Sequence, residues 1–568
     1  MFFSSDTLAV APGLRGSPVC GLAVCGPSLF FAEKRARHIS VDLNLGSYRK
    51  CLALFCRRQP ASPQTARHNG DPTHSRLTRL AKRIATKSAQ TVYSSLNPCY
   101  SFRRMKFKFL ETIWEAGGEI FEVGGSVRDK LLGLPRKDID LLVRNLSFEK
   151  LKGLLQPLGK IALVGKSFGV LKFTPHQAPD QIIDIALPRK EQSTGVGHRD
   201  FEISFDPELS VETDLGRRDF TLNAMALNLK TEQLIDPFNG ATDLKNKLLR
   251  QVFPKAFEED PLRLIRAVQF AARLGLTIES ATWEQMKQHA ALIQTVSPER
   301  ITEELRKLFL APQPSLGFDL MLTSGLLPFL FPELVDLVGI SQDKLPGDDV
   351  YRHTMRVLDA ARADTLLEHP GDLELMISAL FHDTGKAATQ QFDPKKERIV
   401  FYSHQVVSAR LARRWMKRMH VTTLGVNPDN INTMIFNHMF ETKSYYTDKA
   451  IRRFVQKIGQ DLIYKLLDLR LADNRGGKHP RSVQGVLKMR ARVQEELAKK
   501  PPFGPGDLAL TGNDLKTMGF HEGPNIGKVL KALVEKVLED PVWNTQEQLA
   551  TIVKEMMQND PTLLEKKR

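Results

Sequence analysis

The sequence predicts an α+β protein in which a small domain of strands and helices precedes a long helical region. Short apolar segments of strand type, separated by turn residues, lie between residues 120 and 185. From about residue 213 onward, apolar residues recur with helical spacing, most regularly at 261–274 and 298–310. A segment rich in proline and glycine at 500–507 indicates a linker to a last helical piece.

The elements of the first domain are expected in a definite order. Residues 105–116 have the apolar spacing of a helix, which Gly117-Gly118 would end, and a second helix is expected at 126–132. Residues 345–480 are expected to be helical throughout, with interspersed histidines. The predicted strands are 120–123, 138–143, 161–163, 169–174 and 182–185.

Residues 1–104 differ from the rest of the chain in charge and in cysteine content. They carry a net charge of +12, out of +16 for all 568 residues, and they contain all five cysteines. The excess charge therefore says little about the remainder, in which a disulfide framework or a zinc–thiolate site is excluded. We interpret 1–104 as a disordered basic extension, either a targeting segment or a wrongly assigned start, with Met105 opening the folded part.

The part after residue 104 contains no cysteine, which fits a cytoplasmic enzyme. For the whole chain, a hydrophobic content of 42% and a charged content of 26% are ordinary for a globular protein. Because no apolar run approaches the ~20 residues that cross a bilayer, we expect no membrane partner. No protein partner is evident from the sequence.

A first candidate site begins at the paired glycines. Gly124-Gly125, between a predicted strand and helix, would let backbone N–H groups approach a phosphate, and Arg128 could bind a triphosphate. Asp138 and Asp140 follow on a strand, where positions two apart share a face. Two neighbouring carboxylates can hold Mg²⁺ for nucleotidyl transfer. Asp184 is the candidate for a third carboxylate; the alternative is a charge at a strand edge.

A second candidate site is spread over the helical region. It consists of four histidines and two aspartates that recur at intervals of about 20 to 35 residues: His353, His382, Asp383, His404, His438 and Asp473. Imidazole and carboxylate together suit a transition metal such as Ni, Mn, Co or Fe. The alternative is scattered surface histidines, since the chain contains 14.

The first site resembles a known family. Gly-Gly-Ser-Val-Arg-Asp at 124–129, followed by Asp-Ile-Asp-Leu-Leu at 138–142, is similar to the class II tRNA nucleotidyltransferases and bacterial poly(A) polymerases, within the polymerase-β-like nucleotidyltransferases. Further motifs agree at 217–224, 236–240, 259–266 and 297–306. The nucleotide-binding residues that this resemblance implies are Gly124, Gly125, Ser126, Arg128, Arg217, Arg218, Asp219, Asn223, Asp260, Arg263 and Arg266.

One of these motifs is expected to read the incoming base. Asp260 and Arg263 lie three residues apart in a predicted helix and would share a face. A carboxylate acceptor beside a guanidinium fork can match the Watson–Crick edge of cytosine or adenine and reject uracil and guanine. The alternative is an ordinary ion pair on a helix surface.

The second site also resembles a known family. Residues 350–475 are similar to the HD phosphohydrolase domain, which implies phosphatase or cyclic phosphodiesterase action on damaged RNA ends. Residues 510–527 resemble a C-terminal piece of the tRNA nucleotidyltransferases, in which a Gly-Pro-x-Ile-Gly turn would contact the RNA backbone.

The resemblance implies four folded parts: a polymerase-β-like head (105–230), an all-α neck for nucleotide selection and RNA binding (231–340), an HD domain (341–480) and a helical tail (500–568). Mg²⁺ on Asp138 and Asp140 would activate the 3′-hydroxyl of tRNA for attack on the α-phosphorus of CTP or ATP. Two alternatives stay open. One is a poly(A) polymerase or an enzyme that adds only A, and the other is a metal-dependent phosphohydrolase whose head merely binds RNA.

Overall fold

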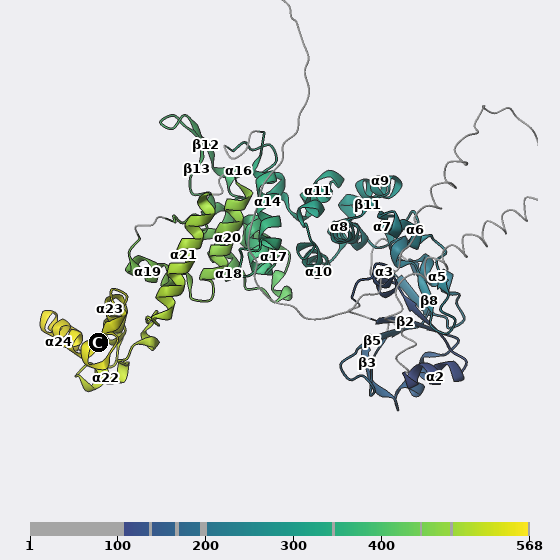
Figure 1. Cartoon of the computed structure of the whole chain (residues 1–568), viewed down its shortest axis with the longest axis horizontal. Coiled ribbons are helices and arrows are strands. Elements are labelled where there is room, and N and C mark those ends of the chain that lie inside the picture. Colours follow the sequence, from purple (N-terminus) through teal and green to yellow (C-terminus); the bar gives the residue numbers. More distant parts are fainter. Residues whose placement is uncertain are drawn as a thin grey trace, which may run out of the picture. The chain divides into compact units, whose positions relative to one another are not determined.

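A computed structural model describes most of the chain after residue 106 (Figure 1). The predicted disorder of 1–104 lies outside the described residues, and so does Asp138. The described ranges are 107–135, 139–164, 170–193, 201–342, 347–442, 446–477 and 481–565.

A seven-stranded sheet forms the head, with the strand order β3-β4-β5-β2-β1-β8-β9. The strands are β1 (Glu119–Val123), β2 (Ile139–Arg144), β3 (Gly159–Val164), β4 (Val170–Pro175), β5 (Ile183–Ala186), β8 (Ala226–Asn228) and β9 (Leu234–Ile235). The central strands β2 and β5 run parallel, and the other neighbours are antiparallel. The predicted strands are therefore confirmed within a few residues, while β8, β9 and the separate hairpin β6 (Arg189–Ser193) and β7 (Phe201–Phe205) were not predicted.

Short helices accompany this sheet. They are α2 (Lys108–Glu115), α3 (Gly125–Leu131), α4 (Phe148–Leu155), α5 (Val211–Gly216) and α6 (Gly240–Lys245). The apolar spacing that predicts α2 corresponds to its buried face, where Phe109 and Ile113 are almost fully buried and Phe109 meets Phe173 of β4 edge to face. Strand β2 is buried on both faces, because Leu141 and Leu142 belong to two different apolar clusters. The strand that carries Asp140 thus lies centrally and is held from both sides.

The chain then continues as helices around a shared core. The first of these are α7 (Ala256–Glu259), α8 (Leu262–Leu274), α9 (Ser280–His289), α10 (Pro298–Phe309), α11 (Ser315–Ser324), α12 (Leu327–Leu330) and α13 (Pro332–Val335). A two-residue parallel pair, β10 (Leu248–Leu249) with β11 (Thr277–Ile278), is added to them. One apolar cluster extends from Phe220 to Val493, so the helices assigned to the neck and those assigned to the HD region pack on a continuous core.

The histidine-bearing region is helical with one exception. Its helices are α14 (Val350–Ala363), α15 (Leu373–Phe381), α16 (Lys386–Thr389), α17 (His404–Arg418), α18 (Pro428–Asn437), α19 (Asp448–Ile458), α20 (Ile463–Gly476) and α21 (Arg481–Ala498). The prediction that 345–480 is helical throughout is wrong at the antiparallel hairpin β12 (Gln390–Asp393) and β13 (Arg398–Phe401). β-Branched and aromatic residues on both sides of the turn Asp-Pro-Lys-Lys favour strands there.

The C-terminal piece has its own small core. Its helices α22 (Gly512–Thr517), α23 (Pro524–Val537) and α24 (Gln546–Asn559) enclose a cluster that includes Leu515, Val529 and Leu549. Across the described ranges, no helix combines the length and the apolar character needed to cross a bilayer.

Candidate active sites

Two carboxylates of the head lie side by side on neighbouring strands. Asp140 of β2 is the direct register partner of Asp184 on β5. Paired residues of adjacent strands direct their side chains to the same face of a sheet, so the two carboxylates share a face. The structure therefore places Asp184 on the strand next to Asp140, as predicted from the sequence.

A lysine that the sequence analysis did not select completes this group. Lys172 of β4 is the register partner of Asp184 on its other side, and its Nζ lies 3.0 and 3.2 Å from the two carboxylate oxygens. Strand alternation could have found it, because Leu171 and Phe173 are fully buried and Lys172 must face the other way. The carboxylate of Asp184 thus stabilises the positive charge of the Lys172 ammonium group.

The paired glycines make a tight passage from β1 into α3. Gly124 has φ 71°, and a Cβ there would stand 2.6 Å from Nη1 of Arg218, so this position requires glycine. The hydroxyl of Ser126 donates to the carbonyl of Val123 (3.1 Å). Arg128 is almost fully buried and donates from Nη1 to Oδ1 of Asn223 (2.7 Å). The glycine motif and the 217–224 motif are thus in direct contact.

The arginines of the second motif are held by a buried carboxylate. Asp214 of α5, which the sequence analysis did not select, accepts hydrogen bonds from Arg217 (2.7 Å) and Arg218 (3.4 Å). Burial acts to raise the pKa of Asp214, but the two guanidinium groups hold it below its usual value. The ionised carboxylate fixes both arginines while leaving them partly exposed.

Asp219 and Arg266 form a forked pair between the head and α8. Oδ2 of Asp219 accepts from Nε (2.9 Å) and Nη2 (2.7 Å) of Arg266, and its Oδ1 accepts from the side chain of Asn223 (3.0 Å). Burial acts to raise the pKa of Asp219, but Arg266 and Asn223 lower it overall. The guanidinium groups of Arg128 and Arg266 also lie over the ring of Phe270, at 5.1 and 5.3 Å.

We expect Arg266→Met to destabilise the protein by about 3–5 kcal/mol, because it leaves the buried carboxylate of Asp219 without its partner. Since the folded-state pKa of Asp219 is lowered, this stabilisation is fully present above the unfolded-state pKa of about 3.9 and is lost as the pH falls through the folded value. Thermal unfolding measured between about pH 7 and pH 2 should show a difference from wild type that is constant above about pH 4 and shrinks below it. Arg273→Met is the control, since that guanidinium lies over the same Phe270 ring at 5.6 Å.

The expected helical pair of Asp260 and Arg263 is not formed. Asp260 has an extended backbone (φ −136°) between α7 and α8, and its carboxylate is bound by Arg300 of α10 at 3.1 and 3.3 Å. Arg263 is buried and donates to the carbonyls of Ala256 (3.2 Å) and Arg217 (2.9 Å). The prediction of a shared helix face is wrong because Pro261 places the helix start at Leu262, after Asp260. The partner of Asp260 is Arg300, a residue of the 297–306 motif that was not predicted to have this role.

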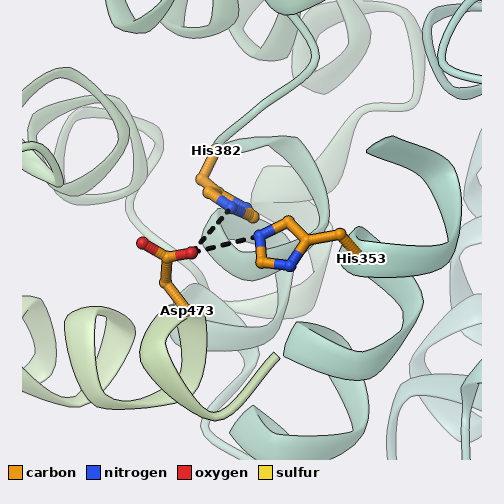
Figure 2. A group of neighbouring side chains, drawn as sticks. All are labelled: His353, His382 and Asp473. Atoms are coloured by element: carbon orange, nitrogen blue, oxygen red, sulfur yellow. Dashed lines mark hydrogen bonds and ion pairs between the residues drawn. The ribbon is translucent and has the colours of Figure 1, made fainter. Parts of the chain in front are cut away.

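The second candidate site is assembled as predicted. Five helices and their ends bring four imidazoles and two carboxylates into two adjoining groups. In the first group, Oδ1 of Asp473 lies 3.1 Å from Nε2 of His353 and 3.8 Å from Nε2 of His382 (Figure 2). The second group comprises Asp383, His404 and His438.

Asp383 connects the two groups. One of its oxygens lies 3.3 Å from Nε2 of His404 and 3.8 Å from Nε2 of His438. The other lies 3.2 Å from Nε2 of His382 and 3.6 Å from Nε2 of His353. Burial acts to raise the pKa of Asp383, yet the surrounding cations and hydrogen bonds hold it well below its usual value. The centre therefore contains an ionised carboxylate among four imidazoles.

Backbone carbonyls set the orientation of all four imidazoles. The Nδ1 atoms of His353, His382, His404 and His438 lie 2.7–3.1 Å from the carbonyl oxygens of Gly476, Ala379, Phe401 and Ile435. A proton on each Nδ1 leaves each Nε2 with a lone pair that points to the carboxylates, as metal-ligating histidines require. Burial lowers the pKa of His438 to about 3, so that imidazole is neutral.

These residues fit a bound metal ion. Nε2 of His382 is buried and has no hydrogen-bond partner among the residues that the structure describes. A buried nitrogen in this state is costly unless an absent ligand satisfies it. The donor set of imidazole nitrogens and carboxylate oxygens suits a divalent transition metal.

Two cations that the sequence analysis did not select hold the carboxylates from outside. Lys386 donates to Asp383 (2.6 Å), and Arg470 donates to Asp473 (2.9 Å). Each lies three positions from its aspartate, a helical spacing that could have indicated them. Close packing adds to this support, because a Cβ on Gly385 would stand 2.2 Å from the carbonyl oxygen of His404. The pieces that carry Asp383 and His404 therefore approach each other as closely as backbones allow.

The mixed sheet with paired aspartates and the helical centre with six side chains of metal-ligand type define a nucleotidyltransferase head joined to an HD region. Four family models match in the same order: the poly A polymerase head domain (120–250), the RNA- and SrmB-binding region of polymerase A (275–337), the HD domain (350–475) and tRNA nucleotidyltransferase domain 2 (482–553). The chain belongs to the family of tRNA nucleotidyltransferases and poly(A) polymerases. Both regions are of classes that depend on divalent metal ions.

Relatives and solved structures agree with this assignment. The multifunctional CCA protein of Actinobacillus pleuropneumoniae serotype 5b (strain L20) is 37% identical over 315 residues, which is 54% of this chain and 72% of the relative. That of Pasteurella multocida (strain Pm70) is 38% identical over 309 residues, 53% of this chain and 69% of the relative. The CCA-adding enzyme of Bacillus stearothermophilus, solved with CTP, shares the fold with a TM-score of 0.58 and 23% identity, over 80% of this chain and 98% of that one.

Proposed function

We propose that this protein adds C and A to the 3′ end of tRNA without a nucleic-acid template, with CTP and ATP as substrates. The observation that carries the proposal is the register that sets Asp140 beside Asp184 on adjoining central strands. The similarity to multifunctional CCA proteins supports tRNA as the acceptor.

In the proposed reaction, the aspartates and the arginines of the head have different roles. Asp138, Asp140 and Asp184 hold Mg²⁺, which when bound supplies a Lewis acid for the 3′-hydroxyl and for the triphosphate. Arg217 and Arg218, fixed by Asp214 and partly exposed, bind the phosphates of the nucleotide. Catalysis consists mainly of positioning and charge stabilisation, because the attack on the α-phosphorus needs no covalent enzyme intermediate.

Base selection is assigned to Asp260 and Arg263. Arg300 orients the carboxylate of Asp260 through hydrogen bonds, and the buried guanidinium of Arg263 is anchored on two carbonyls. To meet a base, the carboxylate of Asp260 would exchange its ion pair with Arg300. The acceptor and the donor fork together match cytosine and adenine.

A poly(A) polymerase is the second candidate, since the model of the poly A polymerase head domain matches 120–250. The complete metal-binding set of the HD region and the names of the relatives favour CCA addition.

For the HD centre we propose phosphohydrolase action on phosphorylated or cyclic-phosphate RNA ends. The four histidines and the two aspartates would hold a transition metal, Ni, Mn, Co or Fe, which would supply Lewis-acid chemistry for phosphate hydrolysis.

Incubation of the full chain with tRNA transcripts and single labelled nucleotides tests the transferase proposal. We expect CTP to be added to a transcript that lacks CCA, ATP to be added to one that ends in CC, and UTP and GTP to be refused. In the same assay Asp260→Ala should lose this choice. Long runs of A on any acceptor would instead identify a poly(A) polymerase, and equal use of all four nucleotides by wild type would contradict the proposal.

A further inference from the structure

The hairpin formed by β12 and β13 projects from the helices beside α16 (Figure 1). We propose that it binds the unpaired 3′-terminal nucleotides of an RNA whose terminal phosphate enters the HD centre. The proposal rests on the phosphohydrolase function proposed above, and it adds the surface that recognises the substrate and the requirement that the RNA end be single-stranded.

Both ends of the hairpin are attached to the metal-binding residues. β12 follows α16, which begins three residues after Asp383, and β13 ends three residues before His404. The carbonyl oxygen of Phe401, the last residue of β13, lies 2.8 Å from Nδ1 of His404. A ligand held on the hairpin is therefore positioned relative to the centre through a few covalent and hydrogen bonds.

One face of the hairpin leads from its tip to this centre. In an antiparallel ladder, opposite residues and those two positions along share a face. Phe392 is paired with Ile399, and the next pair on that face, about 7 Å further in, contains Phe401. Phe392 is 64% exposed and Ile399 37%. The ammonium group of Lys386 lies 5.4 Å from the ring centre of the half-buried Phe401 and also binds Asp383.

The tip is held rigid and carries cations. The hydroxyl of Tyr402 donates to Asp393 (2.7 Å) and accepts from Lys396 (2.7 Å), and the Lys396 ammonium lies over the Tyr402 ring. This bracing lowers the entropic cost of binding a ligand there. Lys395 is exposed next to it, whereas Arg398 lies on the face opposite Phe392.

A strand of RNA fits this surface better than a folded protein does. The exposed apolar face is narrow, and the exposed Lys395 at the tip of the hairpin and Lys386 at its base supply cations for a phosphate backbone. Aromatic side chains beside cations are the usual platform for unpaired bases, because every base has a face that can stack. A terminal phosphate beyond such a stack would reach Lys386 and then the carboxylates that it contacts.

The test compares an RNA substrate with a small one in the full, metal-loaded chain. Phe392→Ala should raise KM for a short RNA with a 2′,3′-cyclic phosphate about tenfold, leave kcat nearly unchanged, and leave hydrolysis of p-nitrophenyl phosphate as in wild type. Phe392→Trp should restore the RNA KM. Gln391→Ala is the matched control, because Gln391 is also exposed but lies on the opposite face of the same hairpin.

A cross-linking readout makes the proposal independent of hydrolysis. RNA with 4-thiouridine as its last base should cross-link to residues 390–402, mapped by mass spectrometry, and Phe392→Ala should abolish that cross-link. Failure of wild type to hydrolyse either substrate would end the phosphohydrolase proposal, whereas the cross-link would still decide on RNA binding. An unchanged RNA KM in Phe392→Ala, or cross-links only outside 390–402, would overturn the hairpin proposal and leave the exposed ring to a protein partner.

Discussion

Asp140→Ala should reduce nucleotide addition by about 1,000-fold or more while leaving phosphate hydrolysis by the HD centre unchanged. Asp140 lies on a strand that is buried on both faces and is paired directly with Asp184, so its loss removes one of the carboxylates that would hold Mg²⁺. The measurement is the rate of C and A incorporation into a tRNA transcript with Mg²⁺, beside hydrolysis of p-nitrophenyl phosphate by the same preparation.

A matched control separates the lost ligand from a general change in charge. Asp180 is an exposed aspartate of the same domain, three residues before β5, and Asp180→Ala should transfer nucleotides as wild type does. Near wild-type transfer by Asp140→Ala would remove Asp140 from the metal site. Loss of both activities together would mean that the substitution disturbs the fold rather than one centre.

The parts of the fold that were predictable are those whose pattern is local. In the helix α2 and the strands β1, β2 and β5, the apolar residues that form the sequence pattern are the residues that the structure buries. The centre of four histidines was predictable because its residue types are rare in combination and only one chemistry uses them together. Their assembly itself depends on contacts more than 100 residues apart, such as His353 with Asp473.

What the sequence did not indicate depends on partners that lie far away along the chain. Asp260 and Arg263 have helical spacing, but a proline between them places one before the helix, and Arg300, 40 residues later, supplies the ion pair. Lys172 becomes relevant only once β4 is known to lie beside β5. The hairpin of β12 and β13 was missed for another reason. Its pairing is local, but each strand is short and lies within a stretch of sequence that otherwise has helical spacing.

The HD centre should be separable from the transferase by a double substitution. His382→Ala with Asp383→Ala removes a buried imidazole that faces both carboxylates, together with the carboxylate that connects the two ligand groups. We expect this variant to lose hydrolysis of 2′,3′-cyclic phosphate and of p-nitrophenyl phosphate, and to bind far less Ni²⁺, Mn²⁺ or Co²⁺ by elemental analysis. Addition of C and A with Mg²⁺ should persist, because the head uses hard carboxylate ligands on a separate sheet.

His420→Ala is the control for the removal of a histidine, since His420 is exposed and pairs with Glu299 outside the centre; it should keep both metal binding and hydrolysis. A moderate fall in nucleotide addition by the double variant has a physical cause, because Lys386 is then left buried without its carboxylate partner and the shared core of the helices is weakened. Metal binding equal to wild type in the double variant would show that the ion is held elsewhere. A wild-type chain that binds these metals but hydrolyses none of the phosphate substrates would reduce the HD centre to a structural role, and the function of the protein to nucleotide transfer alone.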